Sequence, residues 1–251
     1  MAPSIESSEQ IAPRDAITTF KCVLHHSLVT KNSEALQFHA AAALQLQFGS
    51  LSDNIVKSDD RLIASPYNDP PHLLDLKTLD TPNRLLAKAL TVLKPTRDDY
   101  ATAPYAESFN WQEVVDLLPK FPDANGYPWQ RQEFYVVVFR SRLRPDANVQ
   151  LLQVLDIHSH REATASGGLL KYWFGNRNEN NENLATCIWR SREDACLGGT
   201  GPWHKQAVTA ARDLYEQVVF NALSLVIQDG KLGIGDWRES NEKWFTVTEA
   251  E

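Results

Sequence analysis

The segment DIHSHRE carries two histidines two positions apart, and histidine is the side chain best suited to proton transfer near neutral pH. The segment lies in a predicted helix, where residues two apart point to nearly opposite faces, so His158 and His160 cannot share a metal ion. His158 and Glu162, four apart, can lie together, but a metal site needs at least three converging ligands. We therefore predict no metal. His160 is a candidate acid or base, and a surface or capping histidine is the simpler alternative.

A second candidate stretch is CIWRSREDACLGGTGPWHKQAV, residues 187–208. Much of it marks helix ends: Ser191 and Asp194 fit a capping box, paired glycines stop a short helix, and Pro202 opens the next one. His204 stands where a dinucleotide fingerprint needs its third glycine, and neither a P-loop nor a GxSxG elbow is present, so we predict no cofactor. Four side chains lack such a local explanation and face either a ligand or one another: Trp189, Arg190, Trp203 and His204.

Large aromatic rings gather around two predicted strands. Core packing alone prefers leucine, isoleucine and valine to tryptophan, so some of these rings are expected to line an apolar pocket, although all of them could be core. The predicted substrate-binding residues are Tyr172, Trp173, Phe174, Trp189 and Trp203.

The segment KPTRDDYATAPYAESFNW, residues 94–111, is a polar connection that is either a binding loop or lid, or a surface loop held by its own hydrogen bonds. Its Tyr100 and Tyr105, together with Arg190, could donate hydrogen bonds to a developing oxyanion. The predicted catalytic residues are thus His160, His204, Arg190, Tyr100 and Tyr105.

The elements that must hold these residues change in character near residue 125. Before it, short helices are predicted at 33–48, 83–93 and 111–118, among proline-containing loops. We expect a flexible N-terminal segment over 1–20, a helical and loop extension over 21–125 that packs on the core, and the core itself over 126–251.

The pattern of residues after position 125 predicts the fold. Strands are expected at 133–143, 169–175 and 184–190, a helix at 148–166, a long helix from about 202 to 227, and a last strand at 231–237 or 243–248. The order strand, helix, strand, strand, helix, strand is that of an α+β ferredoxin-like (βαββαβ) core.

Bulk composition narrows the function. The 251 residues carry a formal net charge of -7, which disfavours binding to nucleic acid or to an anionic membrane surface. The N-terminus is polar and acidic, and no apolar run reaches the roughly 20 residues needed to span a bilayer, so we expect a cytoplasmic protein. The three cysteines show no CxxC spacing and are expected to be small buried side chains.

Two resemblances add to this. The motifs TRDDYATAPY and GLLKYWFG, within about 73–237, resemble an uncharacterised, conserved-hypothetical family of fungal proteins. More distantly, a strand ending in WRS, a short helix and His204 opening a long helix are similar to the dimeric α/β-barrel superfamily that includes antibiotic-biosynthesis monooxygenases. That resemblance implies a dimeric α/β-barrel-like fold that pairs two sheets, and often cofactor-free chemistry. The first 125 residues are an addition to it.

These observations favour a cofactor-independent enzyme of fungal secondary metabolism, a cyclase, isomerase or lyase, with pericyclic reactions such as Diels–Alder closure included. Its partner would be a small apolar molecule, and a homodimer is expected from the second resemblance. The alternative is a non-catalytic module that binds a ligand or another protein through the same pocket or sheet face.

Overall fold

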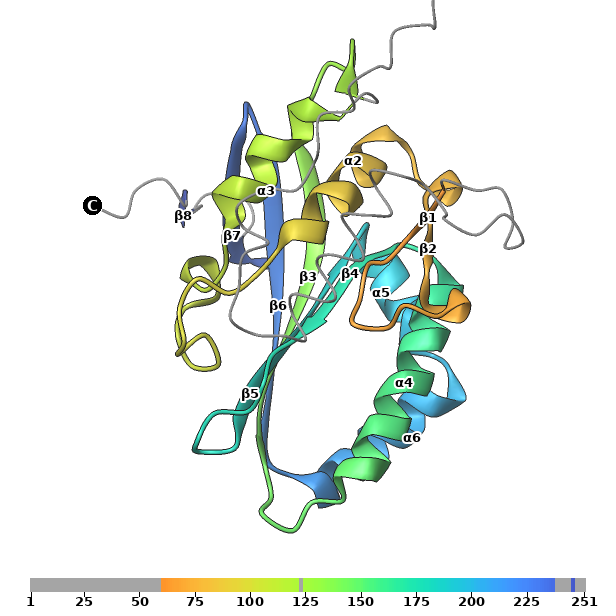
Figure 1. Cartoon of the computed structure of the whole chain (residues 1–251), viewed down its shortest axis with the longest axis vertical. Coiled ribbons are helices and arrows are strands. Elements are labelled where there is room, and N and C mark those ends of the chain that lie inside the picture. Colours follow the sequence, from red (N-terminus) through yellow and green to blue (C-terminus); the bar gives the residue numbers. More distant parts are fainter. Residues whose placement is uncertain (1–59, 122–123, 238–244, 247–251) are drawn as a thin grey trace, which may run out of the picture.

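A six-stranded antiparallel sheet forms the centre of the protein (Figure 1). The computed structural model describes residues 60–121, 124–237 and 245–246 of the 251-residue chain. A separate two-stranded sheet joins β1 to β2. The elements are β1 (Arg61–Leu62), η2 (Pro70–His72), β2 (Leu74–Asp75), η3 (Leu76–Thr78), α2 (Thr81–Ala89), η4 (Leu90–Val92), η5 (Tyr105–Glu107), α3 (Trp111–Leu117), η6 (Leu118–Lys120), β3 (Gln132–Leu143), α4 (Val149–Ser166), β4 (Leu169–Phe174), β5 (Glu182–Trp189), α5 (Arg192–Gly198), α6 (Pro202–Leu214), β6 (Tyr215–Gln228), β7 (Lys231–Asp236) and β8 (Phe245–Thr246).

The core unit runs β3-α4-β4-β5-α6-β6, with the short helix α5 between β5 and α6. Across the sheet these strands lie in the order β4-β5-β3-β6, so the first and third strands of the unit are neighbours and the second and fourth flank them. This is the ferredoxin-like arrangement, and the fold predicted from the sequence is confirmed. β7 and β8 extend the sheet beyond β6.

The last helix and the last strand of the unit were placed wrongly: its fourth strand is β6, and the strand expected at 231–237 is β7, outside the unit. The helix expected from 202 to 227 ends at Leu214, and Tyr215 begins the strand β6. The segment after Leu214 is rich in valine and aromatic residues, which favour extended backbone. It pairs with β3 from Leu143↔Tyr215 to Gln132↔Ile227. These long-range backbone hydrogen bonds make the segment a strand, although its alanines and leucines are spaced as in a helix.

Helix ends follow the local signals in the sequence. The Asn148 side chain accepts a hydrogen bond from the Leu151 N–H at 2.9 Å and caps α4. The Ser191 hydroxyl accepts one from the Asp194 N–H at 3.1 Å and caps α5, as the predicted capping box requires. Pro202 begins α6.

The alternation of residues along β3 separates two covered faces of the sheet. Phe134, Val136 and Val138 belong to one hydrophobic cluster with residues of α2 and α3. Tyr135 and Val137 belong to a second cluster on the side of α4 and α5. The distant resemblance implies a dimer in which the sheets of two copies pack face to face. Such packing would need the sheet face that carries Phe134, Val136 and Val138. Among the described residues, α2 and α3 of the same chain cover that face.

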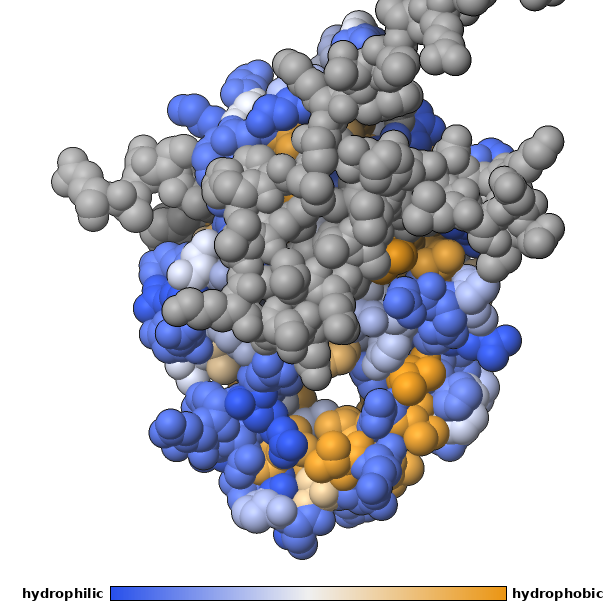
Figure 2. Space-filling view, in the orientation of Figure 1, coloured by the Kyte–Doolittle hydropathy of each residue, from blue (hydrophilic) through white to orange (hydrophobic). Residues whose placement is uncertain are grey.

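Helices α4 and α6 pack together beside the lower part of the strands (Figure 1). Figure 2 shows an opening between this helix pair and the sheet, with apolar surface around it. The elements that border the opening carry large apolar side chains exposed to solvent, which are Val149, Leu151 and Val154 of α4, Val208 of α6, and Val218 and Phe220 of β6.

Some predictions concern residues outside the described ones: the helix at 33–48, the flexible segment at 1–20, and Cys22. Cys187 is half-buried and Cys196 is exposed, so the expectation of a buried side chain is wrong for Cys196, and both are free thiols. None of the helices in the described part of the chain is long and apolar enough to cross a membrane.

Candidate functional site

The strand register places two rows of side chains on the sheet face turned toward α4 and α6, because directly opposite residues of antiparallel strands share a face. The first row is Tyr172, Cys187, Val137 and Ala222. The second row, the aromatic floor, is Phe174, Ala185, Phe139 and Phe220.

The aromatic floor is only partly covered. Phe139 and Phe220 meet edge to face with their ring centroids 5.1 Å apart. Phe174, on β4, is 36% exposed, and Phe220, on β6, is 56% exposed. Exposed aromatic rings on a sheet face are available to a flat apolar molecule.

A carboxyl group lies beside the first row. The Tyr172 hydroxyl donates a hydrogen bond to Oδ1 of Asp156 at 2.5 Å, and the Tyr67 hydroxyl donates to Oδ2 of the same carboxyl. Asp156 is on α4, Tyr172 is on β4, and Tyr67 comes from the segment between β1 and η2. One carboxyl therefore joins three separate parts of the chain.

A pair of imidazoles lies against the same phenols. Nδ1 of His72 lies 2.7 Å from Nδ1 of His160, and the two rings stack with centroids 5.0 Å apart. The His160 ring is 5.2 Å from the ring of Tyr67 and 5.2 Å from that of Tyr172. We call Tyr67, His72, Asp156, His160 and Tyr172 the polar cluster.

Burial governs the protonation of the polar cluster. It raises the pKa of the Asp156 carboxyl, although the hydrogen bonds from Tyr172 and Tyr67 act in the opposite direction. Burial likewise raises the pKa of both phenols, next to the charge of Asp156. Burial, followed by the charge of His72, lowers the pKa of His160 to about 3, and burial also lowers the pKa of His72. At neutral pH the cluster therefore holds neutral imidazoles and protonated phenols around one carboxyl.

The residues of the polar cluster are held by local structure. Asp156 and His160 are four apart on α4 and thus share one helix face. The Tyr172 N–H donates to the Ala64 carbonyl at 2.9 Å, which fixes the segment that carries Tyr67 against β4. His72 closes the short helix η2 with its side chain buried.

The aromatic floor and the polar cluster are adjacent. The Phe174 ring lies 5.7 Å from the Tyr172 ring and 6.4 Å from the Tyr67 ring. The arrangement thus has the two parts of a small-molecule site, an apolar surface and a few polar groups that can orient a ligand.

Of the residues predicted from the sequence, His160, Tyr172 and Phe174 are part of this site. Tyr67, His72 and Asp156 of the polar cluster were missed, as were Phe139 and Phe220 of the aromatic floor. For Asp156 there was a usable signal, its i, i+4 spacing from His160. Tyr67 and His72 had none, because only the packing of the first part of the chain on α4 brings them there.

Three other predicted residues lie on the opposite side of the sheet. The Tyr105 hydroxyl is buried and hydrogen-bonded to the Thr186 hydroxyl at 2.8 Å. Trp173 belongs to the hydrophobic cluster of α2 and α3, and its ring meets the Tyr100 ring edge to face at 5.5 Å. The Tyr100 hydroxyl donates to the Asn176 carbonyl at 2.8 Å. These residues pack the face away from the polar cluster.

The four predicted residues in the connection from β5 to α6 are Trp189, Arg190, Trp203 and His204, and most of them contact other residues of the protein. Trp189 is buried, and Arg190 makes an ion pair with Asp194 at 2.7 Å. The Trp203 ring stacks on the His158 ring, with centroids 4.1 Å apart.

His204 lies at the start of α6. Its N–H and that of Trp203 both donate to the Glu162 carboxylate at 3.0 Å, which caps the helix from α4. Burial lowers the pKa of the His204 imidazole. The expectation that His158 and Glu162 lie on one side of α4 agrees with these contacts.

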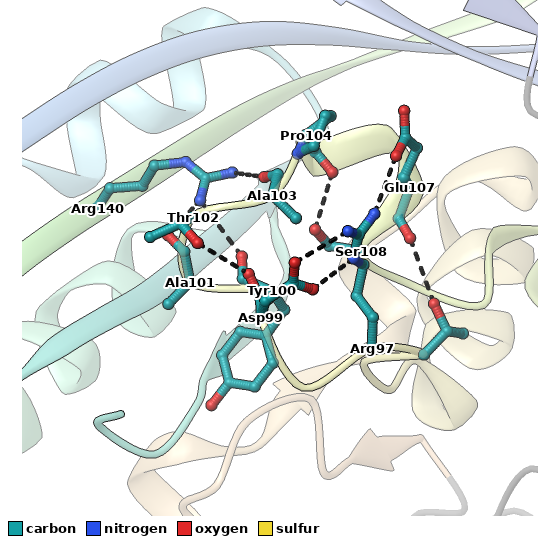
Figure 3. A network of polar contacts seen from close by, with 11 residues as sticks. Arg97, Asp99, Tyr100, Ala101, Thr102, Ala103, Pro104, Glu107, Ser108 and Arg140 are labelled. Carbon is teal, nitrogen blue, oxygen red and sulfur yellow. Dashed lines mark hydrogen bonds and ion pairs between the residues drawn. The ribbon is translucent and has the colours of Figure 1, made fainter. Parts of the chain in front are cut away.

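The loop at 94–111 is tied to β3 by one side chain (Figure 3). The Arg140 guanidinium donates to the carbonyl of Ala103 at 2.5 Å, to that of Tyr100 at 3.3 Å, and to that of Ala101. Arg97 adds ion pairs within the loop. These bonds favour the interpretation as an ordered surface connection over that as a lid.

In the described part of the chain, no three histidine, cysteine, aspartate or glutamate side chains converge as they would around a metal ion. In the polar cluster, the carboxyl accepts hydrogen bonds from two phenols, and the two imidazoles contact each other directly through their nitrogens.

Comparison with known proteins identifies the family. A family model described as PB2B2.08-like matches residues 63–238. The chain belongs to the PB2B2.08-like family. The UPF0643 protein PB2B2.08 of Schizosaccharomyces pombe is 37% identical over 188 residues, which covers 71% of this chain and 85% of the yeast protein. The resemblance to a conserved fungal family is confirmed, and the matched residues of the PB2B2.08-like family include the whole polar cluster.

The solved structures that this chain resembles each match only part of it. Rv0793 from Mycobacterium tuberculosis is 22% identical, with 36% of this chain and 92% of that chain covered and a TM-score of 0.33. SnoaB, a cofactor-independent oxygenase from Streptomyces nogalater, is 12% identical, with 36% and 90% covered and a TM-score of 0.30. A putative antibiotic biosynthesis monooxygenase from Nitrosomonas europaea is 10% identical, with 41% and 94% covered and a TM-score of 0.32.

Proposed function

We propose that this protein is a cofactor-independent enzyme of fungal secondary metabolism that acts on a small apolar molecule as a cyclase, isomerase or lyase. The observation that carries the proposal is the Asp156 carboxyl, bonded to two phenols beside an exposed aromatic floor. An apolar molecule on the floor would place a polar edge against the phenols of Tyr67 and Tyr172.

The polar cluster is suited to moving a proton. A phenol oxygen that takes a proton from a substrate carbon or hydroxyl can pass its own proton to Asp156 along the existing hydrogen bond, leaving a protonated carboxyl and a neutral phenol. The raised pKa of Asp156 favours this uptake. Return of the proton to another atom of the substrate completes an isomerisation, an elimination or a ring closure.

The neutral imidazoles have a positioning role in this proposal. His160 packs against the rings of both phenols, and His72 holds His160 through its Nδ1. Their neutral state keeps a competing positive charge away from the Asp156 carboxyl. Pericyclic closure, such as a Diels–Alder reaction, would use the same site through shape and a hydrogen bond to a substrate carbonyl.

The test uses the full-length protein and a fungal metabolite extract, with mass spectrometry before and after incubation. We expect compounds to be retained and converted by the wild type, and the rate to fall about a hundredfold or more in Asp156→Asn, in line with general acid–base contributions. Asp213→Asn, an exposed carboxylate on α6, is the matched control and should keep full activity.

Two outcomes would contradict the proposal. Retention without conversion by the wild type would assign the site to ligand binding alone. Full activity in a folded Asp156→Asn variant would remove the polar cluster from the reaction.

A further inference from the structure

We propose that β6 is a dimerisation strand, whose outer edge over Tyr215–Ala222 pairs antiparallel with the same edge of a second copy, about a two-fold axis at Val219. The proposal concerns a surface other than the polar cluster and does not depend on the reaction.

The first half of β6 is uncovered. All six residues from Glu216 to Asn221 are exposed, although the strand is paired with β3 on its inner side. β7 pairs only with Leu223–Gln228, so no strand in the described part of the chain satisfies the outer backbone groups of Tyr215–Ala222. An unpaired edge of this length is a template for a further strand.

This edge is also apolar on both faces. Phe220 is 56% exposed, Val218 45% and Val219 38%. Phe220 and Val218 lie on the face toward α4 and α6, and Val219 lies on the other, because side chains alternate along a strand. A partner strand that covers this edge must therefore present apolar side chains on both of its own faces.

A second copy meets that requirement. An axis through Val219 perpendicular to the sheet places Val218 opposite Phe220 of the second copy, twice, which is a favourable aromatic with β-branched pair. On the other face it places Gln217 opposite Asn221, whose amides can hydrogen-bond, and Val219 opposite itself. Glu216 then faces Ala222, so no like charges stand directly opposite each other.

This interface differs from the pairing of sheet faces that the distant resemblance implies. The α2–α3 face is covered by the chain's own residues, whereas the outer edge of Tyr215–Ala222 pairs with no strand among the described residues. Edge pairing would also extend the aromatic floor, since Phe220 is its end residue and Val218 of the second copy would lie beside it.

The mass of the full-length protein in solution tests the proposal first. Sedimentation over roughly 1 μM to 1 mM should show a dimer of the 28.3 kDa chain. Val219→Lys sets two ammonium groups opposite each other and should weaken the dimer at least about tenfold, while the monomer that it releases stays folded. Val208→Lys, at a 63% exposed position of α6, is the matched control and should dimerise as the wild type does.

Cross-linking tests the register, and it covers the case in which the lysine variant fails to fold. In a background of Cys22→Ser and Cys196→Ser, Val219→Cys should form an intermolecular disulfide under mild oxidation, because opposite residues have Cα atoms about 4.5–5.5 Å apart. Phe220→Cys should not, because its two copies would be offset by two residues.

A monomer throughout the concentration range would overturn the proposal, as would a dimer that Val219→Lys leaves unchanged or equal cross-linking of the two cysteine variants. A monomer whose β6 amides are protected from hydrogen exchange would assign the edge to a segment of the same chain instead.

Discussion

Nδ1 of His72 and Nδ1 of His160 lie 2.7 Å apart in a buried contact, so one imidazole must donate to the other. The accepting nitrogen carries no proton, and a second proton at this contact would set two N–H groups against each other. The contact therefore favours the neutral form of both imidazoles, which agrees with the lowered pKa of His72 and His160.

This contact predicts acid sensitivity. His160 is protonated near pH 6.5 when unfolded and only near pH 3 when folded, so the unfolded chain binds more protons between these values. Stability should thus fall as pH falls through this window, by at most about 1.4 kcal/mol per pH unit. Urea unfolding at pH 7 and pH 5 should show the loss in the wild type and a smaller loss in His160→Met. His158→Gln should behave as the wild type, and an unchanged slope in His160→Met would refute the assignment.

Removal of one phenol should raise the pKa of Asp156 further. Tyr67→Phe deletes a hydrogen bond that stabilises the ionised carboxyl, so the pKa should move up and the stability should fall by about 1–3 kcal/mol. Carbon-13 NMR of the labelled carboxyl would measure the pKa. Tyr105→Phe also loses a buried hydroxyl contact, but on the other face of the sheet, and should leave the Asp156 titration where it was. Equal shifts in both variants would contradict the contact.

The polar cluster shows why part of the site could not be predicted. Tyr172 and Phe174 were found because strands and their aromatic residues are local features of the sequence. Tyr67 reaches Asp156 across 89 positions of the chain, and His72 reaches His160 across 88. No period or motif records such a contact, since it depends on how the segment before α2 packs on β4 and α4.

The strand β6 shows the corresponding limit for the fold. The first four elements of the unit were predicted correctly because β3, α4, β4 and β5 each carry their own signal. In β6, apolar residues at spacings of three and four suggested a helix, whereas pairing with β3 made it a strand. The apolar residues of that segment do have helical spacing. The strand that pairs with it lies about 80 residues earlier, and a pattern of neighbouring residues carries no information about so distant a partner.

Lys171 should make the stability of the protein depend on pH above neutrality. Its side chain is completely buried, and burial lowers the pKa of its ammonium to about 7. The folded chain then binds fewer protons than the unfolded chain between pH 7 and pH 10.5, so the wild type should gain stability as pH rises from 7 to 10. Lys171→Met has no amine to titrate, so it should lose this dependence on pH. Lys205→Met, at an exposed position, is the control and should keep the dependence of the wild type. A Lys171→Met variant that gains stability with pH as the wild type does would refute the assignment.

Arg140 should hold the loop at 94–111 to the sheet. Its guanidinium donates to three carbonyls of the loop, at Tyr100, Ala101 and Ala103, and the ammonium of a lysine cannot reproduce that planar set of donors. Arg140→Lys should therefore leave carbonyls without a partner and increase hydrogen exchange in the loop about tenfold or more, while the amides of β3 to β5 keep their protection. Arg97→Lys, whose ion pairs are exposed, should change the exchange little. If Arg140→Lys instead increased exchange across the whole sheet equally, the side chain would be supporting the fold as a whole and not this loop.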